Sequence, residues 1–250
     1  MIKSTKKFLG GVSLNIKFGV IKIRNFAFPA AILILSMAFA IPVIRTEKAD
    51  ANAVKTVCFT FDDGPSERTE EIIEILSKEN IKATFFVIGP SDIKTDERLF
   101  KIHSEGHSIG LHTMSHDYDK IYLSAENFLK DLEEEREWIY SITGKECRIF
   151  RFPGGSNNYN APKWLIEEVK EKTKEKGLTW YDWNADGKDS LGELLSPEEI
   201  AENVLSSEFI GSEKVTVLLH DSSTRTTTPE ALKILISEFR KMGYQFEKID

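Results

Sequence analysis

The sequence predicts an α/β fold, in which short strands alternate with helices along one chain. Two observations carry this prediction: β-rich apolar runs recur after residue 53, and the segments between them show the apolar spacing of amphipathic helices. The predicted strands are Thr56–Phe61, Ala83–Ile88, Ser108–Leu111, Arg148–Phe152, Leu178–Tyr181, Val215–Leu219 and Tyr244–Ile249. Such strands, alternating with about six helices, are expected to be parallel and joined by right-handed crossovers, as an open sheet or a barrel.

Several of the intervening helices carry boundary signals. Ser124 is placed to cap a long helix with an apolar face that includes Phe128, Leu132, Ile139 and Ile142. The run Ser196-Pro197-Glu198-Glu199 is typical of an N-cap, a proline at the first helical position and a capping-box glutamate. Thr228-Pro229 opens the last helix, and Gly177 and Gly243 stand where helices are expected to end.

Composition and charge narrow the classes of partner. The chain has 250 residues, 41% of them hydrophobic, and a net charge of −7, which suits a folded domain with a full core. Residues 1–53 carry eight basic and two acidic residues, a charge of +6, so residues 54–250 carry −13. An acidic body argues against a nucleic-acid partner, because binding to nucleic acids is driven by basic residues. Residues 54–250 show neither a repeat nor a linker and are expected to form one catalytic domain.

The first 53 residues are expected to be a signal sequence or a membrane anchor. Residues 26–44 contain no charged side chain and would span about 28 Å as a helix, close to the thickness of a bilayer core. Basic residues precede this segment, and small-x-small cleavage sites follow it up to Ala53. A cleaved secretory signal and an uncleaved anchor both remain open. Either would place residues 54–250 outside the cytoplasmic membrane, secreted or anchored at its outer face.

The two cysteines are interpreted as small core residues. Cys58 and Cys147 lack the CxxC spacing of a thiolate zinc site, and both lie in apolar, strand-like runs. We favour two buried thiols over a disulfide between them.

Polar residues gather where the predicted strands end. Asp62-Asp63 follows the first strand in place of a glycine-rich phosphate loop, which disfavours nucleotide binding. Further clusters follow later strands: His112 and His116, Arg151 to Gly155, Asp182 to Asp189, and His220-Asp221. Because parallel α/β folds build their sites at the carboxyl ends of the strands, these residues are candidates for one site.

The histidine and aspartate spacings suggest a metal site. His112 and His116 are four residues apart, so a helical turn would point both imidazoles the same way, and one carboxylate would complete a two-His, one-Asp set. Taken alone, the pair is also compatible with ordinary surface or core histidines. His103 and His107 share the spacing but lie at the wrong strand end, so we expect a solvated His103 and a core His107 bonded to backbone. The side chains of Asp62 and Asp63 are expected to diverge, one toward a metal and the other toward a water.

Four motifs resemble those of the polysaccharide deacetylases, the NodB-homology group or carbohydrate esterase family four. They are Thr60-Phe61-Asp62-Asp63-Gly64-Pro65, His112-Thr113-Met114-Ser115-His116, Arg151-Phe152-Pro153-Gly154-Gly155 and Leu218-Leu219-His220-Asp221. The resemblance extends from Val57 to Asp221. It implies a distorted (β/α)7-like barrel, preceded here by the N-terminal hydrophobic segment.

The resemblance also implies roles for individual residues. A divalent metal, usually zinc, would be held by Asp63, His112 and His116. Asp62 would match the general base that takes the proton of the attacking water, and His220 the general acid. Arg151 would match the residue that holds the base in place, and Asp189 the residue that supports the side chain of Arg151 or His220. The backbone N–H of Gly154, the residue after Pro153, would donate to the oxyanion. Trp183 and Leu218 would line the acetyl pocket.

Two positions depart from the family pattern. A further stretch, Asp182 to Ser190, can be laid over another motif of the family, in which Asp186 and Asp189 match the two aspartates. Ser190 replaces the tryptophan that closes this motif, so the groove floor is expected to be more open. Asp117 stands after His116 where proline is common, and could shift the ligand geometry slightly. Neither change removes a catalytic group.

The implied reaction is hydrolysis of N-acetyl groups on a polymeric sugar. The predicted location beside the cell wall favours peptidoglycan; chitin oligomers, exopolysaccharide and O-acetyl xylan are the alternatives within the enzyme class. Two alternatives without enzymatic activity are also considered. One is a non-catalytic glycan-binding module, and the other is a structural wall protein tethered to the membrane. The complete set of catalytic residues disfavours the glycan-binding module, and a structural wall protein would show no affinity for glycans.

Overall fold

A computed structural model describes residues 54–190 and 192–250 of the chain. These residues belong to one unit, Lys48–Asp250. The predicted signal or anchor segment at residues 26–44 lies outside the described residues. Within the described ranges, no helix is both long and apolar enough to cross a membrane.

The described residues form a parallel eight-stranded sheet with the order β5-β4-β3-β2-β1-β7-β6. The eighth strand, β8, pairs with the first three residues of β1. The strands are β1 Thr56–Gly64, β2 Thr84–Val87, β3 Ser108–Leu111, β4 Ile149–Phe150, β5 Thr179–Trp180, β6 Ala185–Asp186, β7 Lys214–His220 and β8 Gln245–Glu247. All of the strand pairs are parallel, as the alternation predicted.

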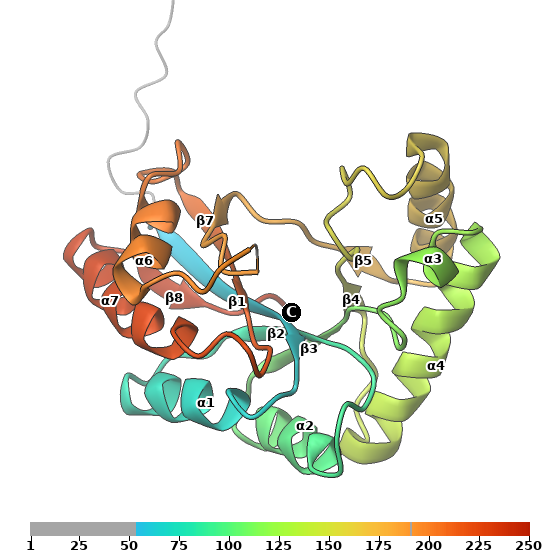
Figure 1. The fold of residues 1–250 in the computed structure, drawn as a ribbon, viewed down its shortest axis with the longest axis horizontal. Coiled ribbons are helices and arrows are strands. Elements are labelled where there is room, and N and C mark those ends of the chain that lie inside the picture. Colours follow the sequence, from blue (N-terminus) through green and yellow to red (C-terminus); the bar gives the residue numbers. More distant parts are fainter. Residues whose placement is uncertain (1–53, 191) are drawn as a thin grey trace, which may run out of the picture. The chain divides into compact units, whose positions relative to one another are not determined.

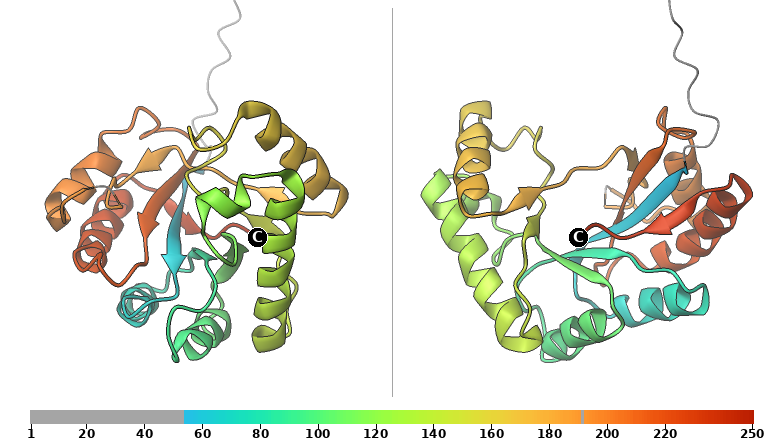
Figure 2. Two further views of the ribbon diagram at one scale, coloured as in Figure 1. Left: turned by 45° about the vertical axis from the view of Figure 1, so that its right-hand side comes forward. Right: turned by 180° about the vertical axis from the view of Figure 1, so that it is seen from behind.

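Helices lie outside the curved sheet (Figures 1 and 2). They are α1 Thr69–Lys78, α2 Thr95–Ser104, α3 Tyr118–Ile121, α4 Ala125–Thr143, α5 Lys163–Glu175, α6 Pro197–Leu205 and α7 Thr228–Lys241. The predicted caps are confirmed: the Ser124 side chain accepts from the Asn127 N–H, and Ser196 forms a capping box with Glu199. The sequence therefore determines these boundaries locally.

The sheet curls but does not close into a full barrel. Its two outer strands, β5 and β6, do not pair with each other in the described part of the chain. The arrangement is therefore a half-barrel, consistent with the distorted barrel that the motifs implied. All seven predicted strands are present, whereas β6 was missed because its two residues lie in a polar segment without strand periodicity.

The core below the site is rich in aromatic side chains. Phe59 and Phe61 of β1 are at most 1% exposed, as expected for a parallel strand that is covered on both faces. Phe128 of α4 stacks on Tyr122 with a ring-centroid distance of 5.7 Å and lies 5.2 Å from Phe152, which follows β4. This packing anchors the segment that continues into Pro153 and the glycines of the third motif.

We predict that Phe128→Ala destabilises the fold by about 3–5 kcal/mol, because it removes a fully buried ring from this aromatic cluster. Urea denaturation of the purified protein would measure the loss. Tyr140→Ala on the same helix is the control, since that side chain is 55% exposed and should cost under about 0.5 kcal/mol. Equal losses from the two variants would contradict the assignment of Phe128 to the core.

Candidate metal and catalytic site

A bulge at the end of β1 turns two adjacent aspartates toward the same place. Asp62 is paired with Phe86 of β2, but the next pair is Gly64 with Val87, so Asp63 is an extra residue in the strand. Asp63 has a left-handed backbone with φ of 69°. The expectation that the two side chains diverge is therefore wrong, because the bulge breaks the alternation of the strand. One carboxylate oxygen of each residue lies 3.6 Å from Nε2 of His112.

The two histidines converge through a loop rather than a helical turn. Residues 112–117 contain no helix, and Thr113 and His116 have positive φ values of 76° and 47°. The ring centroids of His112 and His116 are nevertheless 5.1 Å apart. The two rings thus lie close together, as expected, and their shared role as ligands stays a prediction. The predicted helical geometry is wrong, because left-handed residues in a loop, not a helical turn, bring the rings together.

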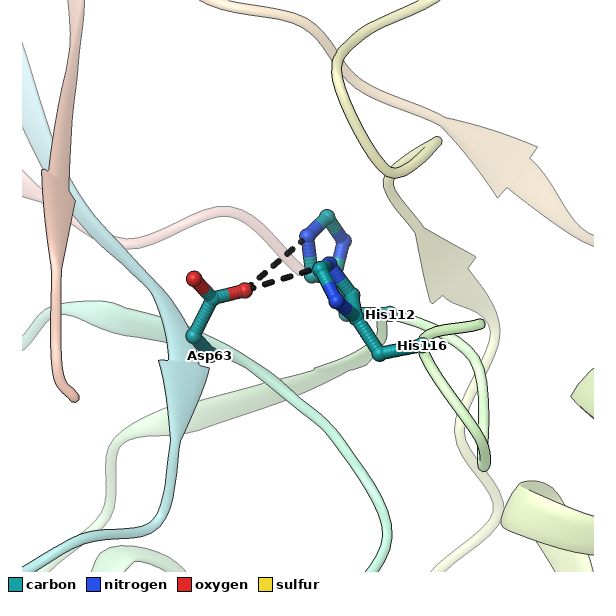
Figure 3. A group of neighbouring side chains, drawn as sticks. All are labelled: Asp63, His112 and His116. Carbon is teal, nitrogen blue, oxygen red and sulfur yellow. Dashed lines mark ion pairs between the residues drawn. The ribbon is translucent and has the colours of Figure 1, made fainter. Parts of the chain in front are cut away.

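Asp63, His112 and His116 each offer one ligand atom, and these atoms all lie within 4.8 Å of one another (Figure 3). Oδ1 of Asp63 is 3.3 Å from Nε2 of His116. This oxygen is buried and accepts no hydrogen bond from the described residues. A buried carboxylate oxygen without a donor is costly unless a cation completes it.

The surroundings of His112 leave its Nε2 available as a ligand. Its Nδ1 lies 3.0 Å from the carbonyl oxygen of Arg151, which can only accept a hydrogen bond. The proton is therefore on Nδ1, and the lone pair of Nε2 faces Asp63. Burial lowers the pKa of His112 to about 3, so the ring is neutral at physiological pH. A neutral histidine with a backbone carbonyl behind it is a typical metal ligand.

Asp62 lies beside these three ligands and is held by Arg151. Nη1 of Arg151 donates to Oδ1 of Asp62 at 2.8 Å and to Oγ1 of Thr60 at 2.7 Å. Burial raises the pKa of Asp62 above its ordinary value, and the charge and hydrogen bond of Arg151 oppose that rise only in part. The sequence-based expectation that Arg151 steadies this carboxylate fits the contact. Burial, however, makes Asp62 a better proton acceptor than an exposed aspartate.

Asp189 contacts His220 rather than Arg151. Oδ1 of Asp189 lies 2.8 Å from Nδ1 of His220, and its Oδ2 accepts from the His220 N–H and from the Thr228 hydroxyl. Burial favours the neutral imidazole, but the hydrogen bond and charge of Asp189 outweigh it and raise the pKa of His220 to about 9. His220 is therefore protonated at neutral pH. The sequence left either Arg151 or His220 as the partner of Asp189, and in the structure the partner is His220.

The other predicted residues surround this cluster. Gly154 is exposed with φ of 77°, and the preceding carbonyl of Pro153 accepts from the Tyr122 hydroxyl at 2.7 Å. The Trp183 ring lies 5.4 Å from the Arg151 guanidinium. Leu218 is 4% exposed and pairs with Thr60 across β1 and β7. The roles of these four residues in binding the oxyanion or the acetyl group stay predictions.

The second histidine pair does not join the cluster of Asp63, His112 and His116. His107 is buried, and its Nδ1 accepts from the Ala83 N–H at 3.1 Å, so the expected bond to backbone is confirmed. His103 lies in α2 and is half-buried, with its ring centroid 6.4 Å from that of Phe100, so it is less solvated than expected. Cys58 and Cys147 are both free and buried thiols, in line with their interpretation as core residues.

Sequence reasoning missed several residues that support the site. Asp221 is fully buried, accepts from the hydroxyls of Ser66 and Thr69, and fills the space that a side chain on Gly64 would need. Asp221 is the last residue of the motif Leu218-Leu219-His220-Asp221, but the motif alone did not indicate what its side chain does. The Tyr118 ring packs edge-on against His116 with a centroid distance of 5.4 Å. No sequence pattern marked Tyr118, because its position depends on the turn of the loop.

The chain is similar to known proteins over most of the described residues. A family model for polysaccharide deacetylase matches residues 49–171. A peptidoglycan-N-acetylglucosamine deacetylase of Bacillus cereus is 31% identical over 199 residues, which cover 78% of this chain and 86% of that protein. The Bacillus subtilis protein YheN is 30% identical over 194 residues; the match covers 77% of this chain and 66% of YheN.

A solved structure has the same fold. The catalytic domain of a peptidoglycan N-acetylglucosamine deacetylase from Eubacterium rectale superimposes with a TM-score of 0.73 and 31% identity, covering 78% of this chain and 89% of that one. Because the chain is 31% identical to the Bacillus cereus protein across 86% of that protein, it belongs to the polysaccharide deacetylase family, the hydrolases of carbohydrate esterase family four.

Proposed function

We propose that this protein is a metal-dependent N-deacetylase that hydrolyses acetamido groups of peptidoglycan and releases acetate. The observation that carries the proposal is the convergence of three ligand atoms, from Asp63, His112 and His116, beside a buried carboxylate and a protonated histidine. A non-catalytic glycan-binding module would not need both an acid and a base held in this way.

The three ligand residues fit a divalent ion such as Zn²⁺. They supply one carboxylate oxygen without a hydrogen-bond donor and two imidazoles, of which His112 presents its lone pair. Two nitrogen ligands and one oxygen ligand are a common protein set for zinc in hydrolases and leave room for a water. A bound ion would lower the pKa of that water and polarise the acetyl carbonyl.

The chain's own groups would perform the remaining steps. Asp62 would take the proton of the attacking water, with its carboxylate fixed by Arg151. The Gly154 N–H would donate to the oxyanion that forms on the acetyl carbonyl. His220, protonated and oriented by Asp189, would give its proton to the departing nitrogen as the carbon–nitrogen bond breaks. The products are acetate and a free amine on the sugar.

The choice of peptidoglycan rests on location and on relatives. The predicted signal or anchor at residues 26–44 would bring the catalytic domain to the cell wall, secreted or held at the outer face of the membrane. The relatives from Bacillus cereus and Eubacterium rectale described above are named for activity on peptidoglycan. Acetate release from peptidoglycan, chitin oligomers, acetylated exopolysaccharide and O-acetyl xylan, compared at equal acetyl concentration, tests the assignment. Preferred turnover of any other polymer would overturn it.

We predict that Asp62→Asn lowers acetate release by about 10²- to 10⁴-fold without loss of bound zinc, because the amide keeps the shape of the side chain but cannot accept the proton. Acetate would be measured enzymatically and zinc by atomic emission. Asp96→Asn, on α2 and still able to accept from the Trp138 ring N–H, is the control and should behave as wild type. Near-wild-type turnover by the Asp62 variant would remove that residue from its role.

We predict that acetate release falls as pH rises through about 9, where His220 loses its proton, and that Asp189→Asn moves this limb toward pH 6.5. A pH–rate profile of both proteins checks the shift. An unchanged alkaline limb in the variant would contradict the assignment of His220 as the acid.

The same contact also affects stability. The pKa of His220 is higher in the folded protein than in the unfolded chain, so its stabilising contribution is fully present below about pH 6.5 and is lost as pH rises through about 9.

We predict that a chelator abolishes acetate release and that added Zn²⁺ restores it. His116→Ala removes one of the three ligands and should lower the bound zinc well below one ion per chain. Turnover that persists at full rate in the chelated, zinc-free protein would contradict metal dependence.

A further inference from the structure

The loop that carries both histidines has an unfavourable backbone. Thr113 and His116 are not glycines, yet both adopt positive φ values, at 76° and 47°. For a residue other than glycine this conformation is unfavourable unless the surroundings hold it in place. Something outside the loop must therefore hold the backbone between His112 and His116.

Two buried carboxylates of α4 contact this loop. Oε1 of Glu135 accepts from the His112 N–H at 3.1 Å. Oδ1 of Asp131 accepts from the Ser115 N–H at 2.8 Å, and its Oδ2 accepts from the Ser115 hydroxyl and from Nζ of Lys120, each at 2.7 Å. The first residue of the loop and the residue just before His116 are thus both fixed from the same helix.

These acids lie on a helix face that is otherwise apolar. Asp131 is 1% exposed and Glu135 is 0% exposed, and they share the buried face of α4 with Phe128, Leu132 and Ile139. Residues four positions apart on a helix lie one above the other, which matches the spacing of the two contacts along the loop. Burying carboxylates among apolar side chains is unfavourable in itself, so their placement points to the loop that they bind.

We infer that Asp131 and Glu135 are positioning residues that hold the His112–His116 loop in the conformation required to bind a divalent metal. The inference rests on the proposed function, since it takes the two histidines as ligands. Neither acid is expected to touch the substrate or the metal. They act through the loop backbone, and removing such a support typically lowers metal affinity by about 10- to 100-fold.

The test compares the Zn²⁺ affinity of Glu135 variants. Glu135→Leu keeps much of the side-chain volume but removes the acceptor, so we expect Zn²⁺ to bind about 10- to 100-fold more weakly in competition with a chromophoric chelator. Glu135→Gln keeps an oxygen that accepts from the His112 N–H and should restore affinity to within about threefold. The absorption spectrum of bound Co²⁺ should change in the leucine variant and not in the glutamine variant. Glu137→Leu, exposed on the same helix, is the matched control.

A second variant tests the other contact without disturbing the core. Ser115 is exposed, so Ser115→Ala should fold normally while losing the hydroxyl bond to Asp131. We expect its Zn²⁺ affinity to fall by about threefold to tenfold. This variant decides the question if Glu135→Leu does not fold.

Two outcomes overturn the inference. One is unchanged Zn²⁺ affinity and an unchanged Co²⁺ spectrum in folded Glu135→Leu or in Ser115→Ala. The other is failure of Glu135→Gln to restore affinity. A wild-type protein that binds Zn²⁺ but releases no acetate from any acetylated glycan would instead overturn the proposed function and leave the role of these acids intact.

Discussion

The buried guanidinium of Arg151 joins parts of the sheet that are not neighbours. Its residue follows β4, but its hydrogen bonds reach Thr60 and Asp62 of β1 and the carbonyl oxygens of Tyr181 and Asp182 beyond β5. Since β2 and β3 separate β1 from β4 in the sheet, the bonds to Thr60 and Asp62 connect strands that do not pair. A cation with no exposed surface must be paired. The curvature of the sheet brings Asp62 of β1 within reach of Arg151, and their ion pair in turn holds the two strands in this arrangement.

The same residue connects Asp62, the proposed base, to His112, one of the proposed metal ligands. Its side chain fixes Asp62, while its backbone carbonyl accepts from Nδ1 of His112 and thereby selects the tautomer that leaves Nε2 free. On the other side of β1, Asp189 orients His220 in the same way. Asp62 and His220, the proposed base and acid, therefore lie beside partners of opposite charge: a cation beside Asp62 and an anion beside His220.

Much of this arrangement could be predicted from the sequence. Apolar runs identified the strands, and parallel strands bring their carboxyl ends to one edge, so Asp63, His112, Arg151 and His220 were expected together. The bulge at Asp63 could not be predicted, because no local preference requires an aspartate with positive φ. The loop after His112 was predicted to be a helical turn, because no local preference indicates that Thr113 and His116 have positive φ values. Both depend on contacts from distant segments.

The supporting residues were the hardest to find. Glu135 and Asp131 appear in the sequence as charged positions of an ordinary amphipathic helix, and only the packing of α4 against the histidine loop shows that they are buried. That the sheet stays open between β5 and β6 could not be predicted either, since neither the short β6 nor an open edge leaves a periodic signal. The sequence pattern thus determines which groups assemble, whereas long-range packing determines how they are aimed.

The proposed function requires Asp63, His112 and His116 to hold one divalent ion together. Anomalous X-ray diffraction from crystals of the zinc-loaded protein, recorded on both sides of the zinc absorption edge, would locate that ion. We expect a single strong peak in contact with Oδ1 of Asp63 and Nε2 of both histidines. A peak at any other cluster, or none at these three atoms in protein that releases acetate, would contradict the proposal.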